Sequence, residues 1–134
     1  MRLSLAACCL LLVAAPPAFA AKPQEPGTNV DMPYLMAPMT VDGKLVAYAY
    51  ISSQIIAVSP NAAVEIRLKV PFIQDAFVRD VNARPVTRTD DPQTVDRAAL
   101  MARLLADAKR EAGADKVAGI RFTAIQIAPL RPNP

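Results

Sequence analysis

The sequence contains no histidine and no tryptophan, and its two cysteines, Cys8 and Cys9, are neighbours near the N-terminus. Because histidine and cysteine are the usual zinc ligands, their absence from the rest of the chain excludes zinc sites of that type and thiol chemistry there. The chain has four glycines, and none falls at the spacing of a phosphate-binding loop. Aromatic residues make up 5% of the chain, which disfavours a surface that stacks on nucleic-acid bases.

Charged residues are nearly balanced in sign. The net charge is +3, and basic and acidic side chains are mixed along the sequence without long runs of either. Nucleic-acid-binding arms carry clustered Lys and Arg, so we expect no nucleic-acid partner. With 134 residues, 53% of them hydrophobic, the chain is long enough for one domain with a modest core.

Residues 1–20 have the layout of a secretory signal peptide. Arg2 is the positive start, the stretch from Leu3 to Ala15 is apolar, and two prolines follow it. Small residues surround a cleavage position between Ala20 and Ala21, which predicts export of the chain. The alternative is an uncleaved membrane anchor, although a spanning helix needs about 20 apolar residues and this run is shorter.

The rest of the chain divides into a linker, a domain and a tail. Residues 21–33 are rich in proline and lack hydrophobic periodicity, so they are expected to form a linker. Strands are predicted over 34–41, 45–58 and 116–128, and Asp42-Gly43 is a typical hairpin turn. Residues 129–134 form a proline-rich tail. Tyr48 and Tyr50 on the second strand are expected in the core, and Ser52-Ser53 is expected to satisfy local hydrogen bonds.

Two helical regions are predicted. Ser59 and Pro60 have the pattern of an N-cap followed by a first-turn proline. The stretch from Asn61 to Val70 fits a short helix, but its alternating apolar residues fit a strand equally well. We expect Pro71 to reset the backbone and to open a new helix, since proline disfavours the helical conformation of the residue before it. A second helix is predicted over 95–112, with Gly113 just past its end.

The segment VPFIQDAFVRDV, residues 70–81, allows two interpretations, an active site or a packing element. Asp75 and Arg79 are four residues apart and can form an ion pair. Asp75 and Asp80 are about 140° apart around a helix, so they cannot easily share a substrate. Phe72 and Phe77 are expected in the core, with a subunit interface as the alternative. The candidate packing or interface residues are Pro71, Phe72, Ile73, Asp75, Phe77 and Arg79.

These patterns predict an α+β fold, in which a small antiparallel sheet of about three strands packs against two helices. The sequence shows no Gly-x-Ser-x-Gly elbow, and we expect no catalytic residue, no metal site and no cofactor. A hydrolase that uses Asp75, Asp90 or Asp91 is the enzymatic alternative. Arg84, Arg88 and Arg97 flank the polar loop 82–94 and are expected in solvent.

Three stretches resemble the flagellar basal-body-associated FliL family. PFIQDAFV, from Pro71 to Val78, is similar to that family's Pro-x-Ile-x-Asp helix start. The predicted helix over 96–112 corresponds in place to a family segment rich in Leu, Ile, Glu and Lys. VAGIRFTAIQ, from Val117 to Gln126, is similar to the family's closing strand. The resemblance covers about residues 30–128.

The resemblance implies a periplasmic domain over residues 34–128 that is similar to stomatin (SPFH) domains. It implies a non-enzymatic accessory protein that forms homo-oligomers and contacts flagellar stator or basal-body proteins close to the membrane, in support of motility. The second hypothesis is a periplasmic structural or binding module with no flagellar role.

Overall fold

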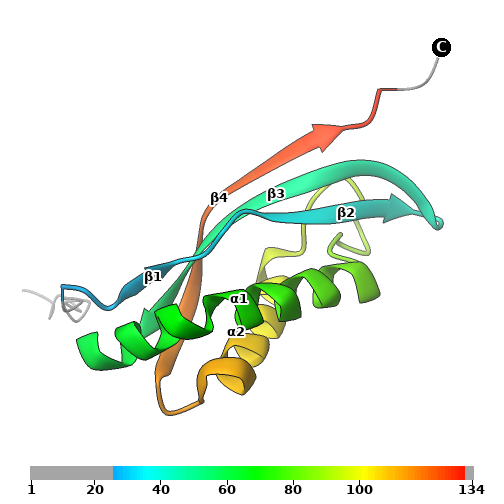
Figure 1. Ribbon diagram of the computed structural model, residues 1–134. Coiled ribbons are helices and arrows are strands. Elements are labelled where there is room, and N and C mark those ends of the chain that lie inside the picture. Colours follow the sequence, from blue (N-terminus) through cyan, green and yellow to red (C-terminus); the bar gives the residue numbers. More distant parts are fainter. Residues whose placement is uncertain (1–25, 132–134) are drawn as a thin grey trace, which may run out of the picture.

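The computed structural model describes residues 26–131, which form one antiparallel sheet and two helices (Figure 1). This arrangement confirms the predicted α+β class. The predicted signal peptide and its cleavage position at Ala20 and Ala21 lie outside the described residues. The elements in chain order are β1 (Asn29–Asp31), β2 (Leu35–Val41), β3 (Lys44–Ala57), α1 (Pro60–Ala83), α2 (Arg97–Ala112) and β4 (Val117–Pro129).

Strand β3 is the centre of the sheet and pairs antiparallel with each of the other three strands. β1 and β2 share one edge of β3, with Asp31 opposite Gln54 and Leu35 opposite Ile51, and β4 occupies the other edge. The predicted linker therefore ends earlier than expected, because three of its residues form β1. β3 extends past the end of β2, and pairing there lets the chain bury Val30.

The turn between β2 and β3 confirms the predicted hairpin. Asp42 and Gly43 both have positive φ angles, 50° and 76°, and Val41 pairs directly with Lys44. Two consecutive residues in the left-handed region match the twist of the strands they connect, which is why Asp-Gly is favoured here.

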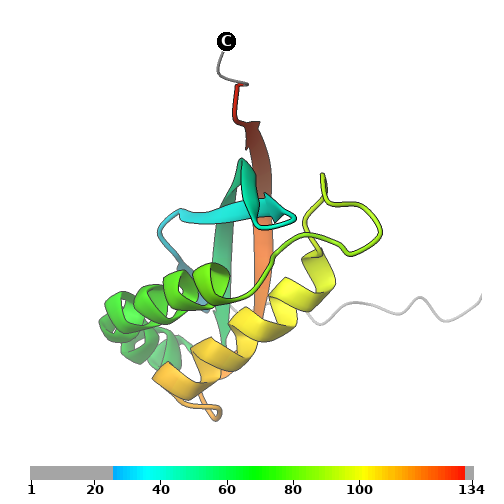
Figure 2. The same cartoon turned by 90° about the vertical axis from the view of Figure 1, so that its right-hand side faces the viewer.

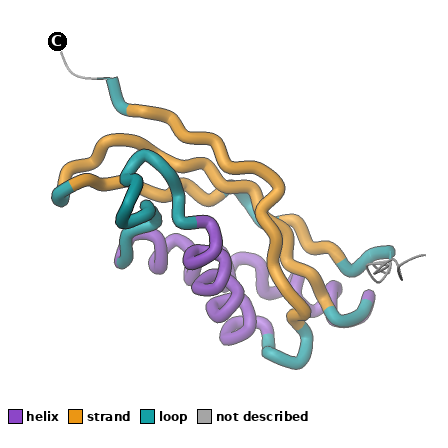
Figure 3. The backbone as a smooth tube through the Cα atoms, turned by 180° about the vertical axis from the view of Figure 1, so that it is seen from behind, coloured by secondary structure: helices purple, strands orange, loops and turns teal. Residues whose placement is uncertain are grey.

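Both helices cover the same face of the sheet, and the core lies between these two layers (Figures 2 and 3). Alternate residues of β3 point to this face, and several of them are alanines that let the helices approach closely. α1 lies under β1 and β2, whereas α2 lies under β4. The largest fully buried side chains are Leu35, Met39, Ile51, Ile55, Ile66, Ile73, Phe77, Leu100 and Leu104.

The expectation that Tyr48 and Tyr50 lie in the core is wrong. Both side chains point to the face of the sheet opposite the helices, where Tyr48 is half-buried and Tyr50 is 38% exposed. Their neighbours Ala47 and Ala49 point inward, because successive strand residues alternate between faces. A pattern that is apolar on both faces could not show which face the helices cover.

The stretch from Asn61 to Val70 is helical, and α1 continues without interruption through Pro71 for 24 residues. The expected reset at Pro71 is therefore wrong. Proline removes one backbone hydrogen bond and crowds the carbonyl one turn earlier. Pro71 and Arg67 both lie on the exposed side of α1, so this loss falls on the solvent side, while Ile66 and Ile73 hold both halves of the helix on the sheet.

The ends of both helices are capped by side chains or backbone groups that the sequence indicates. Ser59 Oγ accepts from the Ala62 N–H at 3.1 Å, and Asp96 Oδ1 accepts from the Ala99 N–H at 3.1 Å. Gly113 ends α2 with a φ of 110°, as predicted. Within residues 26–131, neither helix is both long enough and apolar enough to cross a bilayer.

Candidate functional site

The six candidate residues all lie on α1 but on two different sides of it. Ile73 and Phe77 are fully buried against the sheet. Pro71, Asp75 and Arg79 are exposed, and so is Phe72, at 59%. The expectation that Phe72 packs in the core is therefore wrong; its side chain lies instead beneath the ammonium group of Lys69, which is 5.4 Å from the ring centroid.

Asp75 and Arg79 form the predicted ion pair, with 2.8 Å between Oδ2 and Nη2. Asp80 is on another side of α1 and is 7% exposed, so the two carboxylates do not share a site, as predicted. Asp80 makes contacts of its own with two arginines. Its Oδ2 accepts from Arg84, and its Oδ1 accepts from Arg103 Nε at 2.8 Å.

The Asp80 carboxylate joins α1 to α2. Arg103 belongs to α2, and its Nη1 also donates to the Pro85 carbonyl just after α1 at 2.9 Å. Both carboxylate oxygens are thus occupied by guanidinium groups, so Asp80 has a structural function in holding the helices together. Sequence reasoning missed this role, although Arg84 lies four residues after Asp80, a spacing that favours an ion pair on a helix.

A small polar cleft of about 250 Å³ lies beside Asp80 between the two helices. Asp107 of α2 lines it, is 4% exposed, and accepts from Arg110 Nη2 at 2.5 Å through Oδ1. No group of three or more Asp, Glu, His or Cys side chains that could hold a metal ion occurs in the part of the chain that the structure describes. Asp80 directs both oxygens at arginines and joins the helices through Arg103, whereas Asp107 pairs within α2 and its buried Oδ2 makes no hydrogen bond to the described residues.

The serine pair Ser52-Ser53 lies at a bulge, where the register of β3 against β4 shifts. Ser53 is 3% exposed, and its Oγ makes no hydrogen bond to the described residues, contrary to the expectation that it satisfies a local one. It faces Phe122 across the strands, with no basic group bonded to it, so it lacks the partner that would activate a nucleophile.

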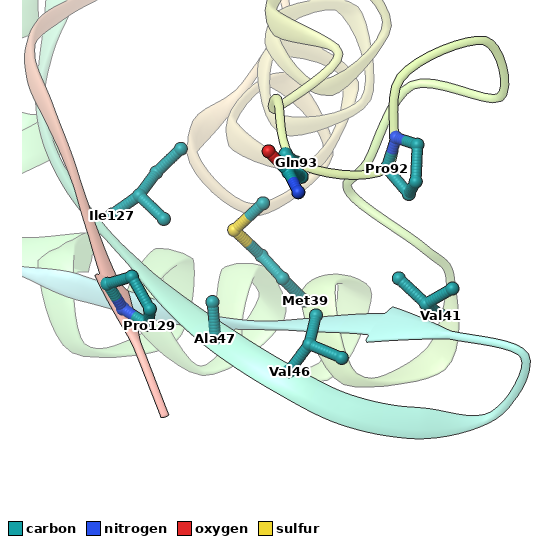
Figure 4. Close-up of a pocket in the computed structure, with 8 residues that line it drawn as sticks. All are labelled: Met39, Val41, Val46, Ala47, Pro92, Gln93, Ile127 and Pro129. Carbon is teal, nitrogen blue, oxygen red and sulfur yellow. The ribbon is translucent and has the colours of Figure 1, made fainter. Parts of the chain in front are cut away.

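An apolar pocket of about 600 Å³ opens where the sheet extends past the helices (Figure 4). Its floor is formed by β2, β3 and β4, and its rim by the loop before α2, which a bridge between Thr87 and Val95 closes into a small hairpin. Gln93 is the one polar residue among its eight lining residues, which makes the pocket suited to apolar groups. The lining residues are Met39, Val41, Val46, Ala47, Pro92, Gln93, Ile127 and Pro129.

The outer edge of β4 beside this pocket carries backbone groups that no described strand pairs with. Leu130 donates its N–H to the Val46 carbonyl on β3. Because the direction of backbone groups alternates along an antiparallel strand, Ile125 and Ile127 must turn their N–H and C=O groups away from β3. Pro129 follows the same alternation but has no N–H.

Arg97 limits this free edge at its other end. Arg97 is exposed, as expected, and in addition its Nη2 donates to the Phe122 carbonyl at 3.1 Å and its guanidinium lies 5.9 Å from the Phe122 ring centroid. The free segment of the β4 edge is therefore short and centred on Ile125 and Ile127. Arg88, also expected in solvent, remains exposed but pairs with Asp90 at 2.6 Å.

The geometry thus provides an exposed strand edge next to an apolar pocket. Ile127 belongs to both, since its backbone is on the free edge and its side chain lines the pocket. Sequence reasoning missed this combination, because the pocket brings together residues from β2, β3, β4 and a loop. Comparison of the chain with protein-family models and with curated proteins finds no match to either.

Proposed function

We propose that this chain is a non-enzymatic periplasmic accessory protein of the flagellar basal body or stator, which supports motility through contacts with other proteins and with further copies of itself. The observation that carries the proposal is the free β4 edge beside the apolar pocket. A free strand edge beside an apolar pocket supports contact with another polypeptide, whereas arginines bind both carboxylate oxygens of Asp80 and one of Asp107.

An extended segment of a partner can add to the sheet at this edge. Its backbone would hydrogen-bond to the outward groups of Ile125 and Ile127, and one of its apolar side chains would enter the pocket. In such strand addition the backbone bonds provide affinity and the pocket selects the side chain. Arg97 and Pro129 restrict pairing to a short segment, which protects the edge against unlimited strand addition.

The flagellar assignment rests on the resemblance to the FliL family. Two of the resembling stretches, Pro71 to Val78 and Val117 to Gln126, lie on α1 and β4. The second stretch contains the strand with the free edge. A periplasmic structural or binding module without a flagellar role is the alternative, since the same surface serves any partner that contributes an extended apolar segment.

Deletion of the gene in its native host, followed by a swarming assay, tests the proposal. We expect the deletion to reduce swarming and the unaltered gene to restore it. Ile127→Glu should fail to restore it, because the charge enters the apolar pocket at a side chain that is 40% exposed and tolerates change without unfolding. Ala118→Glu is the matched control, since Ala118 is exposed on β4 outside the pocket and the free segment.

The deletion tests the flagellar role, and the two variants test the contact surface. Normal swarming after deletion would refute the flagellar role. It would favour the alternative, a periplasmic structural or binding module with no flagellar role. If Ile127→Glu restores swarming as well as Ala118→Glu does, the β4 edge and pocket are not the contact surface. Circular dichroism of both variants verifies that each protein is folded.

A further inference from the structure

The solvent side of the first half of α1 carries a continuous set of apolar side chains, which we call the α1 ridge. It consists of Val64, Leu68, Pro71 and Phe72, which recur at three and four residues and so lie within one arc of about 100°. Val64, Leu68 and Phe72 are 55%, 74% and 59% exposed. We propose that the α1 ridge docks the protein on an anionic membrane surface.

Basic side chains lie on both sides of the α1 ridge. Arg67 is on one side, and Lys69 is on the other, with its ammonium group over the Phe72 ring. The one acidic residue of this half of the helix, Glu65, forms an ion pair with Lys116. Long basic side chains can extend past an inserted apolar crest to reach anionic headgroups, so the arrangement fits a negatively charged lipid surface.

The shape of the α1 ridge favours a membrane over a protein partner. A specific protein interface usually involves about 20–30 residues on each side, whereas this ridge has four residues on a convex helix. The exposed ion pair of Asp75 and Arg79 follows Phe72 along α1 and interrupts the apolar surface, beyond which Val78 is 42% exposed. A few apolar side chains with adjacent basic residues suffice for weak, reversible attachment to an anionic bilayer.

The position of the α1 ridge in the fold agrees with attachment to a surface. α1 lies along one face of the sheet (Figure 3) and buries its other side there, so the exposed ridge residues point away from the sheet. The chain enters the fold next to the same half of α1, where Arg67 Nη2 donates to the Asn29 carbonyl at 3.3 Å. Strand β1 therefore runs beside the half of α1 that carries the ridge, within the sheet layer.

Tryptophan fluorescence provides a local test, because the chain contains no tryptophan of its own. Phe72→Trp places an indole on the α1 ridge, and Tyr50→Trp places one on the opposite, sheet side of the molecule as the matched control. The full chain of each variant is mixed with vesicles of phosphatidylcholine, with or without phosphatidylglycerol. Some vesicles carry brominated acyl chains, which quench an indole that inserts among them.

We expect the indole at position 72 to shift its emission to shorter wavelength and to be quenched in vesicles that contain phosphatidylglycerol. The indole at position 50 should show neither change. Replacing Arg67 and Lys69 by glutamine in the Phe72→Trp background should weaken vesicle binding about 30-fold, and added salt should weaken it similarly.

Three results would overturn the proposal. The first is an unchanged emission at position 72 in anionic vesicles, and the second is an equal response at positions 72 and 50. The third is a blue shift at position 72 that depends on protein concentration without lipid, which would show that a second copy covers the ridge. This readout is independent of swarming, so it tests the membrane contact separately from the flagellar role.

Discussion

Replacement of Asp80 by alanine is expected to lower the free energy of unfolding by about 3 kcal/mol. The loss of one partner from a fully buried ion pair costs roughly 3–5 kcal/mol. Arg103 is 19% exposed and keeps its bond to the Pro85 carbonyl, so we assign about 2–3 kcal/mol to its lost pairing. Arg84 is 57% exposed, and its pairing adds less than about 1 kcal/mol.

The matched control for this prediction is Asp75→Ala. Asp75 also pairs with an arginine four residues later, but both side chains are about two-thirds exposed, so we expect a loss below about 0.5 kcal/mol. Thermal unfolding followed by circular dichroism measures both variants. For a domain of this size, Asp80→Ala should lower Tm by roughly 10–20 °C, and Asp75→Ala by less than about 4 °C.

Two results would refute the argument. Equal Tm values for the two variants would show that the burial of Asp80 does not strengthen its ion pairs. The second concerns a double variant, Asp80→Leu with Arg103→Met, which replaces the ion pair by apolar side chains. If the contact between the helices is equally stable with two apolar side chains as with an ion pair, this variant should recover most of the lost stability. A further loss would mean that the charges themselves are required.

Other substitutions test the two sides of α1 and the loop before α2. Pro71→Ala should raise the free energy of unfolding by about 1–3 kcal/mol in a urea titration, because it restores a helical N–H on the exposed side. Phe77→Ala should lower it by about 3–5 kcal/mol, whereas Phe72→Ala should change it by less than about 1 kcal/mol, since Phe77 is fully buried and Phe72 is not. The hydrogen bond from Arg88 holds the pKa of Asp90 below its ordinary value of 3.8, so the pair stabilises the fold above that pH and loses this contribution as the pH falls through the lowered pKa. NMR titration should show Asp90 returning toward the ordinary pKa in Arg88→Gln.

The hairpin and the ends of both helices could be predicted because local chemistry determines them, whereas β1 was not predicted. The left-handed turn at Asp42-Gly43 needs residues that tolerate positive φ, and Ser59 and Gly113 have the side chain and the freedom that helix ends require. These signals involve only a few neighbouring residues, so they can be recognised from the sequence alone.

The features that could not be predicted depend on packing between distant segments. The residues from Asn61 to Val70 fit a helix and a strand equally well, and contact of Ile66 with the sheet decides for the helix. A helix can continue through Pro71 because other contacts hold both halves. Asp80 is buried because Arg103, on another helix, comes close to it.

The candidate surfaces were beyond prediction for a related reason. The sequence shows that Phe72 is apolar and on a helix, but Phe72 and Phe77 differ by five residues, and only the position of the sheet shows which one it covers. The free edge of β4 depends on which strands are neighbours, which alternation within one strand does not determine.

The pairing of β3 with β4 has a consequence for how the chain folds. β4 pairs along most of β3, from Ala47 to Ala57, some seventy positions earlier in the sequence. Contacts between such distant segments form slowly and cannot form before β4 has left the ribosome. Until then β3 keeps one long edge without a partner strand, and that edge is open to pairing with other chains.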